Sequence, residues 1–258
     1  MNSKIKKILS KKNKTKIICL TAYTKNFSEI LDEYTDIILV GDSLGSVLYS
    51  FDSTKKVTLD MMIEHAKSVR QGIKKSLMVV DMPYNTYRSK KEALKNAKKI
   101  IKCTKADAVK LEGGKKIVNI VEHLRKNKIN VMGHLGILPQ SQKGKFRYKG
   151  KTNFERKNLL TDSQLLQKSG VFSIVLECIE TKLTKKITQK LKIPTIGIGS
   201  SVNCDGQVLV TDDLIGLNLT TIKFVKSFQN IRKYIKLAIK KFSRDVKKNK
   251  YPSKKYSY

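Results

Sequence analysis

The chain has 258 residues, 40% of them hydrophobic, and a formal net charge of +33 at pH 7. This length suffices for one large domain, and no apolar run reaches the roughly 18 residues that a membrane-spanning helix needs. The N-terminal residues lack the long apolar core of a signal peptide, so we expect a cytoplasmic protein. The four cysteines are dispersed without a Cys-x-x-Cys pair, which argues against a zinc knuckle or a disulfide framework.

The charge comes almost entirely from lysine, which supplies 47 of the 54 basic residues, whereas arginine supplies 7. Proteins that read nucleic acids favour the bidentate guanidinium of arginine over the point charge of lysine. Three interpretations remain: compositional drift of an AT-rich genome, steering of anionic small substrates, and nucleic-acid binding. We favour drift, and expect neither a nucleic-acid nor a membrane partner.

Eight short apolar runs predict buried strands, at 16–21, 37–40, 77–80, 108–111, 130–133, 173–176, 194–198 and 208–210. Between most of them, apolar residues recur at helical spacing. Such alternation is typical of a parallel sheet with crossover helices, and eight units fit an α/β protein with a (β/α)8 TIM barrel. We therefore predict a single barrel domain over 1–258, with an N-terminal extension at about 1–14 and a basic C-terminal helical tail at about 221–258.

Two further segments stand out. The polar, basic stretch 141–152 has no helical period and predicts a loop over the barrel mouth, either a lid or a disordered segment. Residues 221–250 carry an apolar stripe at helical spacing opposite a lysine-rich side. We expect this helix to dock onto the barrel or a sister subunit; the alternatives are a membrane surface or another partner helix.

Acidic residues stand where apolar runs end. Asp42, Asp81 and Glu112 each follow one predicted strand, and Glu177 ends another. The carboxyl ends of barrel strands converge on one mouth, and carboxylates are the ligands that a hard cation such as Mg²⁺ prefers. The sequence therefore predicts a metal-dependent site at this mouth.

Ten short motifs follow one another along the chain. They are Thr21-Ala-Tyr23, Val40-Gly-Asp-Ser-Leu-Gly45, Asp52-Ser-Thr54, Asp81-Met-Pro83, Val109-Lys-Leu-Glu-Gly-Gly114, Gly133-His-Leu-Gly136, Pro139-Gln-Ser141, Leu176-Glu-Cys178, Ile193-Pro-Thr-Ile-Gly-Ile-Gly199 and Asp205-Gly-Gln207. With them, the chain from about 21 to 216 resembles the ketopantoate hydroxymethyltransferase family of the phosphoenolpyruvate/pyruvate barrel superfamily. The resemblance implies hydroxymethyl transfer from 5,10-methylenetetrahydrofolate to 3-methyl-2-oxobutanoate through a Mg²⁺-stabilised enolate. The products are 2-dehydropantoate, for pantothenate biosynthesis, and tetrahydrofolate. It also implies a large homo-oligomer, often a decamer.

The resemblance assigns roles to individual residues. Asp42 and Asp81 are implied to bind the metal and substrate directly, with Glu112 as a third ligand, directly or through water. Ser43 is implied to hydrogen-bond the substrate, and Glu177 to accept the C3 proton. His134 is implied to orient the ligand or a carboxylate, with a structural imidazole as the alternative.

Lys110 lies two residues before Glu112, so both side chains point to the same face of one strand. We expect its ammonium beside the substrate carboxylate.

Four positions depart from the family pattern. Lys145 and Lys149 stand where Gly and Gln are expected, Ser201 replaces a third Gly, and Ile222 replaces a Pro. Two rival functions remain, a different Mg²⁺-dependent 2-oxo-acid lyase or aldolase of the same superfamily, and a nucleic-acid-binding protein. The residues that contact folate carry no readable motif.

Overall fold

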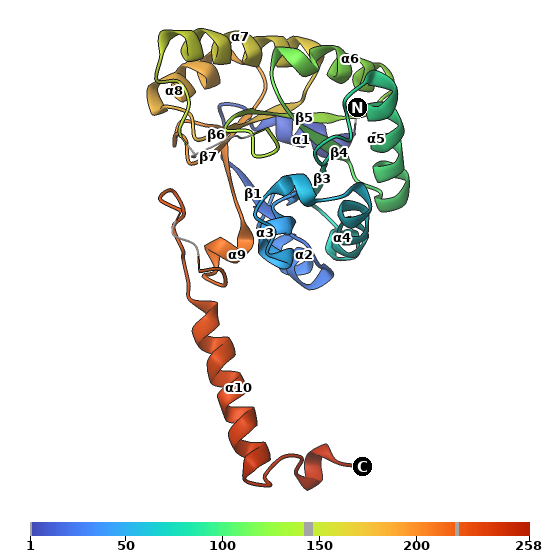
Figure 1. Ribbon diagram of the computed structural model, residues 1–258, viewed down its shortest axis with the longest axis vertical. Helices are drawn as coiled ribbons and strands as arrows, with labels where there is room; N and C mark the ends of the chain where they lie inside the picture. The colour runs from blue at the N-terminus through green and yellow to red at the C-terminus, as the bar shows by residue number, and fades with distance from the viewer. Residues whose placement is uncertain (1, 142–146, 220–221) are drawn as a thin grey trace. The chain divides into compact units, whose positions relative to one another are not determined.

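The computed structural model describes residues 2–141, 147–219 and 222–258, and in it eight parallel strands close into a barrel in chain order (Figure 1). The strands are β1 Ile17–Thr21, β2 Ile37–Val40, β3 Leu77–Asp81, β4 Ala108–Glu112, β5 Val131–Gly136, β6 Ser173–Glu177, β7 Thr195–Ile198 and β8 Gly206–Leu209. Strand β8 pairs with β1, which closes the barrel. The predicted (β/α)8 fold class and all eight predicted strands are confirmed.

Helices connect the strands and lie outside them, as Figure 1 shows for α5 to α8. They are α2 Lys25–Leu31, α3 Leu44–Tyr49, α4 Leu59–Gly72, α5 Lys90–Thr104, α6 Val118–Lys126, α7 Asn153–Ser169 and α8 Thr181–Lys190, with the 3-10 turns η1 Thr54–Lys56 and η2 Lys115–Ile117. Several begin at a hydroxyl cap, because the side chains of Thr58, Ser89 and Thr152 each accept a hydrogen bond from a first-turn N–H.

The barrel strands bury side chains on both faces. Inward-pointing residues such as Leu77, Val79 and Ala108 form one apolar cluster inside the barrel. The alternate residues, such as Met78 and Val80, belong to a second cluster with the helices. The inward series continues past each apolar residue by steps of two. Four strands, β3 to β6, therefore carry a polar inward-pointing side chain at or near their carboxyl ends, and this alternation positions the site.

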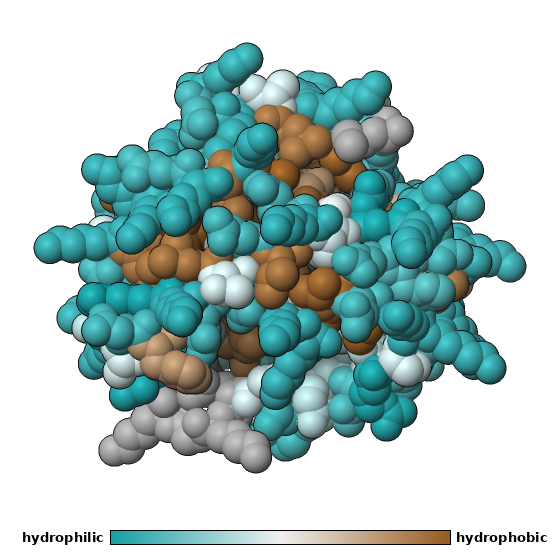
Figure 2. All heavy atoms as spheres, turned by 90° about the horizontal axis from the view of Figure 1, so that it is seen from above, coloured by the Kyte–Doolittle hydropathy of each residue, from teal (hydrophilic) through white to brown (hydrophobic). Residues whose placement is uncertain are grey.

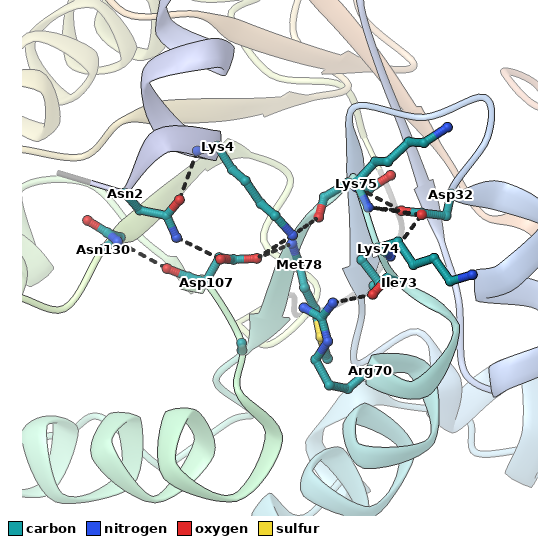
Figure 3. Close-up of polar contacts among 12 residues, drawn as sticks. Asn2, Lys4, Asp32, Arg70, Ile73, Lys74, Lys75, Met78, Asp107 and Asn130 are labelled. Atoms are coloured by element: carbon teal, nitrogen blue, oxygen red, sulfur yellow. Dashed lines mark hydrogen bonds and ion pairs between the residues drawn. The ribbon is translucent and has the colours of Figure 1, made fainter.

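The N-terminal end of the barrel is closed by α1, Ser3–Ser10, within the predicted extension. Ile5 and Ile8 are only 1% exposed and join the interior cluster. Polar contacts tie the helix to residues that immediately precede strands: the Asn2 amide donates to Asp107 Oδ1 at 2.6 Å, and Lys4 Nζ donates to the carbonyl of Ser76 at 2.8 Å (Figure 3). The extension therefore packs as a plug opposite the mouth.

Hydrophilic side chains dominate the face seen in Figure 2, with apolar atoms visible between them. Helix α5 illustrates how this arises: it buries Ala93, Ala97 and Ile100, and its lysines are exposed. The positive charge thus lies largely on the outer faces of helices. No helix of the described residues is long and apolar enough to cross a membrane.

The chain divides into two units, the barrel up to Val210 and the segment Thr211–Tyr258. The second contains α9 Thr211–Leu214, α10 Ile231–Lys247 and η3 Lys254–Tyr256. The helix predicted at 221–250 was too long, because residues 222–230 are not helical and Asn230 caps α10 by accepting from Lys233 N at 3.3 Å. A single domain over 1–258, and the docking partner of this helix, stay predictions.

Candidate active site

The predicted site residues gather at the carboxyl ends of neighbouring strands. Asp81 ends β3, Glu112 ends β4 and Glu177 ends β6. Asp42 lies two positions after Val40, the last residue of β2. The strand register pairs Asp81 with Lys110 on β4, and Glu112 with His134 on β5. Barrel closure thus brings residues from five separate segments to one mouth.

Asp42 and Asp81 are adjacent and buried. The backbone N–H of Asp42 donates to Asp81 Oδ2 at 3.1 Å. Burial, followed by the charges of Asp81 and Glu112, raises the pKa of Asp42 to about 8. Burial likewise raises the pKa of Asp81, although Lys110 opposes this. The raised pKa values mean that the pair does not readily hold two negative charges while no cation is bound.

Lys110 is a buried lysine inside a barrel strand. Its Nζ lies 2.9 Å from Asp81 Oδ1. Burial lowers the pKa of Lys110, but the charges of Asp81, Glu112 and Asp42 outweigh this effect and raise the pKa above its ordinary value. A lone buried ammonium would be costly, so these carboxylates are what keep Lys110 charged.

His134 lies between two carboxylates. Its Nε2 is 3.1 Å from Glu177 Oε2, and its Nδ1 is 3.4 Å from Glu112 Oε1. Burial and the charge of Lys110 lower the pKa of His134, but Glu112 and Glu177 outweigh them and raise it to about 9. For Glu112, burial raises the pKa, but His134 and Lys110 prevail and lower it. At neutral pH His134 is therefore an imidazolium that lies between the side chains of Glu112 and Glu177.

Ser43 follows Asp42 and is half-buried at the start of α3. Its hydroxyl lies 2.8 Å from the hydroxyl of Tyr23, within hydrogen-bonding distance. His65 lies on α4 and contacts the carbonyl of Tyr23 through Nδ1 at 2.8 Å. The substrate contact predicted for Ser43 stays a prediction.

Two residues in contact with this site were not predicted from the sequence. Gln140 donates from Nε2 to Asp42 Oδ2 at 2.8 Å, and Tyr87 donates from its hydroxyl to Gln140 Oε1 at 2.5 Å. Gln140 belongs to the Pro139-Gln-Ser141 motif, which marked the family but suggested no role for the amide. Tyr87 lies outside every motif, and no sequence signal pointed to it.

Residues 2–254 match the ketopantoate hydroxymethyltransferase family. The chain belongs to this family. The 3-methyl-2-oxobutanoate hydroxymethyltransferase of Pelagibacter ubique (strain HTCC1062) is 66% identical over 258 residues, the whole of both chains. The enzyme of that name from Anaplasma marginale (strain St. Maries) is 45% identical over 97% of this chain and 91% of its own.

Solved structures with little sequence identity share the fold. Phosphonopyruvate hydrolase in complex with oxalate and Mg²⁺ gives a TM-score of 0.63 at 8% identity, covering 99% of this chain and 93% of its own. For 2,3-dimethylmalate lyase the TM-score is 0.63 at 11% identity, with coverages of 95% and 89%. These likenesses establish the common barrel alone.

The departures from the family pattern affect loops. Two contacts of Lys149 are made by its backbone: its N–H donates to the carbonyl of Cys178 at 2.8 Å, and its carbonyl accepts from the N–H of Glu180 at 2.9 Å. Ser201 is buried, and its hydroxyl accepts from the N–H of Asn203 at 3.2 Å. Ile222 belongs to the C-terminal unit. Lys145 lies outside the described residues, with the rest of 142–146 in the predicted loop at 141–152.

The donor set of this family member suits a divalent cation in part. Within the described residues, no group of three or more His, Cys, Asp or Glu side chains is arranged to hold a metal by itself. Mg²⁺, however, is commonly bound by one or two carboxylates, with water and substrate oxygens completing its shell. The adjacent Asp42 and Asp81 fit that pattern.

Charge gives the stronger argument. Lys110 and His134 offer two positive charges against the four carboxyl groups of Asp42, Asp81, Glu112 and Glu177, and the raised pKa of Asp42 reflects both its burial and the neighbouring carboxylates.

An anionic oxo acid would be repelled by such a mouth, and a divalent cation would remove this repulsion.

Proposed function

We propose that this chain transfers a hydroxymethyl group from 5,10-methylenetetrahydrofolate to 3-methyl-2-oxobutanoate, forming 2-dehydropantoate and tetrahydrofolate in pantothenate biosynthesis. The observation that carries the proposal is full-length identity of 66% to a relative bearing the name of that activity. The mouth described above adds chemical support, because the carboxylates, the ammonium and the imidazole to which we assign roles gather there. The one-carbon donor is inferred from the reaction class.

For the base we propose Glu177, and accessibility supports this choice. Its side chain is 16% exposed, whereas those of Asp81 and Glu112 are 3% and 2% exposed. A substrate that enters from the mouth can therefore reach Glu177 more readily than the other two. His134, 3.1 Å away, orients this carboxylate and holds a positive charge beside it.

Asp42 and Asp81 are the proposed direct ligands of Mg²⁺, with Glu112 as a third, directly or through water. When bound, Mg²⁺ would polarise the 2-oxo group and lower the energy of the enolate by several kcal/mol. Lys110 contributes a buried positive charge that attracts the substrate carboxylate, and Ser43 a hydroxyl for a hydrogen bond to the substrate. Glu177 takes the C3 proton, and C3 then forms a bond to the one-carbon unit. One water molecule is consumed: it supplies the hydroxyl oxygen of the new hydroxymethyl group as the bonds from the one-carbon unit to the folate nitrogens break and tetrahydrofolate leaves.

We further propose that the enzyme acts in the cytoplasm as a homo-oligomer, a decamer if it follows its family, without a nucleic-acid or membrane partner. Light scattering coupled to gel filtration would measure the assembly. Titration with RNA and DNA at several salt concentrations would test the basic surface, because phosphate contacts weaken steeply with salt.

The activity is tested by turnover of 3-methyl-2-oxobutanoate with 5,10-methylenetetrahydrofolate and Mg²⁺, followed by detection of 2-dehydropantoate. EDTA should abolish turnover, and added Mg²⁺ should restore it. No product with the folate, together with cleavage of a 2-hydroxy diacid to an oxo acid, would instead favour the rival lyase.

The base is tested separately by NMR, which follows exchange of the substrate C3 proton with deuterated water in the presence of Mg²⁺ and without folate. Glu177→Gln keeps the shape of the side chain but cannot accept the proton. The exchange rate should fall by about 10²- to 10⁴-fold, the usual contribution of a general base. Equal exchange in the variant and the wild type would assign the proton transfer to another group.

A further inference from the structure

Gln140 is a neutral side chain enclosed among charged ones. It follows β5 in the connection towards α7 and is 2% exposed. Its Nε2 donates to Asp42 Oδ2 at 2.8 Å and to the carbonyl of Met82 at 3.0 Å, while its Oε1 accepts from the hydroxyl of Tyr87 at 2.5 Å. The amide group therefore has partners on both sides.

The chemistry of these partners fixes which way the amide points. The carbonyl of Met82 can only accept, so the NH₂ group must face it, and the same nitrogen then points to Asp42. The hydroxyl of Tyr87 can donate, so it faces the amide oxygen. Tyr87 is itself largely enclosed, and burial raises the pKa of its hydroxyl, which therefore stays protonated as a donor.

The backbone of the same residue reaches a second carboxylate. The N–H of Gln140 donates to Glu112 Oε2 at 3.1 Å. One residue thus bonds one oxygen of Asp42 and one of Glu112, which come from the ends of different strands. Through Tyr87, the same contacts extend to the segment that follows β3.

We propose that Gln140 is a positioning residue, which orients the carboxylate of Asp42 for a divalent cation and is itself held by Tyr87. This inference rests on the proposed function. Hydrogen bonds from outer residues to metal-binding carboxylates fix their orientation, and losing one typically weakens metal affinity or activity about 10- to 100-fold. Gln140 contacts no reacting atom and acts only through Asp42 and Glu112.

The experiment compares Mg²⁺ affinity by titration calorimetry in the full-length wild type, Gln140→Ala and Gln140→Glu. The alanine variant should bind Mg²⁺ about 10- to 100-fold more weakly. Gln140→Glu keeps the size and packing but replaces the donating NH₂ with an oxygen facing Asp42, so it should not rescue binding. Rescue by glutamate would show that residue 140 only fills space, and would overturn the proposal.

Gln167→Ala is the matched control. The Gln167 side chain, on α7, also bonds the main chain, accepting from Lys192 N at 2.6 Å just ahead of β7, at the opposite end of the barrel from the mouth. Its loss should leave Mg²⁺ affinity unchanged. Tyr87→Phe should weaken Mg²⁺ binding by itself but add little in a Gln140→Ala background, because the hydroxyl acts through the amide.

Wild-type affinity in Gln140→Ala overturns the proposal. If that variant does not fold, wild-type affinity in Tyr87→Phe does so instead. A wild-type protein that neither binds Mg²⁺ nor forms product would refute the proposed function itself, which is a distinct result. Weaker Mg²⁺ binding in Gln140→Ala, with wild-type thermal stability and no rescue by glutamate, supports the proposal.

Discussion

Asp42→Asn should inactivate the enzyme yet stabilise it without metal. Asp42 is buried against Asp81 and Glu112, and burial together with these two charges raises its pKa to about 8. Asparagine has the same shape, retains an oxygen that can accept from Gln140, and carries no charge. The substitution therefore removes a source of repulsion that only protonation or a bound cation would otherwise relieve.

The sign of the pH dependence follows from proton binding. Between the ordinary pKa of 3.8 and about 8, the folded protein holds the proton of Asp42 more tightly than the unfolded chain does. Stability therefore falls as the pH rises through this window, and the loss is complete above pH 8. Each pKa unit corresponds to about 1.4 kcal/mol, so the cost to the metal-free fold is several kcal/mol.

Thermal unfolding in EDTA at pH 5 and pH 8.5 measures this effect. One kcal/mol shifts the Tm of a domain of 150–250 residues by about 2–4 °C. Asp42→Asn should thus melt at least roughly 5 °C above the wild type at pH 8.5, with a smaller gap at pH 5. Asp60→Asn is the control, since Asp60 forms an exposed ion pair with Lys99. Mg²⁺ should stabilise the wild type but not Asp42→Asn.

The reasoning is refuted if Asp42→Asn melts below the wild type at pH 8.5 in EDTA, or if the gap between them does not widen with pH. Either result would mean that the site compensates its own negative charge, and the electrostatic argument for a divalent cation would then fail.

Three further substitutions test other parts of the chain. Lys110→Met should raise KM for the oxo acid about tenfold or more, because a hydrogen bond to a charged group contributes about 1.5–3 kcal/mol; an unchanged KM would contradict the role. Asp32 accepts from three backbone N–H groups at 2.7–3.1 Å, which outweigh burial and lower its pKa, so Asp32→Asn should cost about 2–3 kcal/mol in denaturant unfolding at pH 7. That difference should shrink as the pH falls below about 4, where the wild-type carboxylate takes up a proton, and a constant difference would refute its electrostatic origin. Ile8→Ala should lower the free energy of unfolding by about 2–5 kcal/mol and leave kcat unchanged. Ile30→Ala, at a side chain 63% exposed, should change it by no more than about 0.5 kcal/mol, and equal losses of stability in the two variants would contradict the role of α1 as a plug.

The sequence by itself determined the barrel and most of its site. A strand covered on both faces is a nearly continuous apolar run, so each strand was visible locally, and the carboxylate or histidine at its end was visible as a break in that run. Because side chains alternate, Lys110 and Glu112 had to share a face. The predicted C-terminal helix began too early, because the apolar stripe continues through 222–230, whereas α10 begins at Ile231 after the cap at Asn230.

Only the tertiary structure decided how these side chains contact one another. Gln140 lies 98 residues from Asp42 in the chain and 53 from Tyr87, and a neutral amide leaves no periodic signal. Contacts between residues far apart in the chain also produce three other features. These are the ion pair of Lys110 with Asp81, the position of His134 between two glutamates, and the N-terminal plug. Barrel closure brings distant strand ends within a few ångströms of each other, and at that distance burial and neighbouring charges shift the pKa values of Asp42, Lys110 and His134.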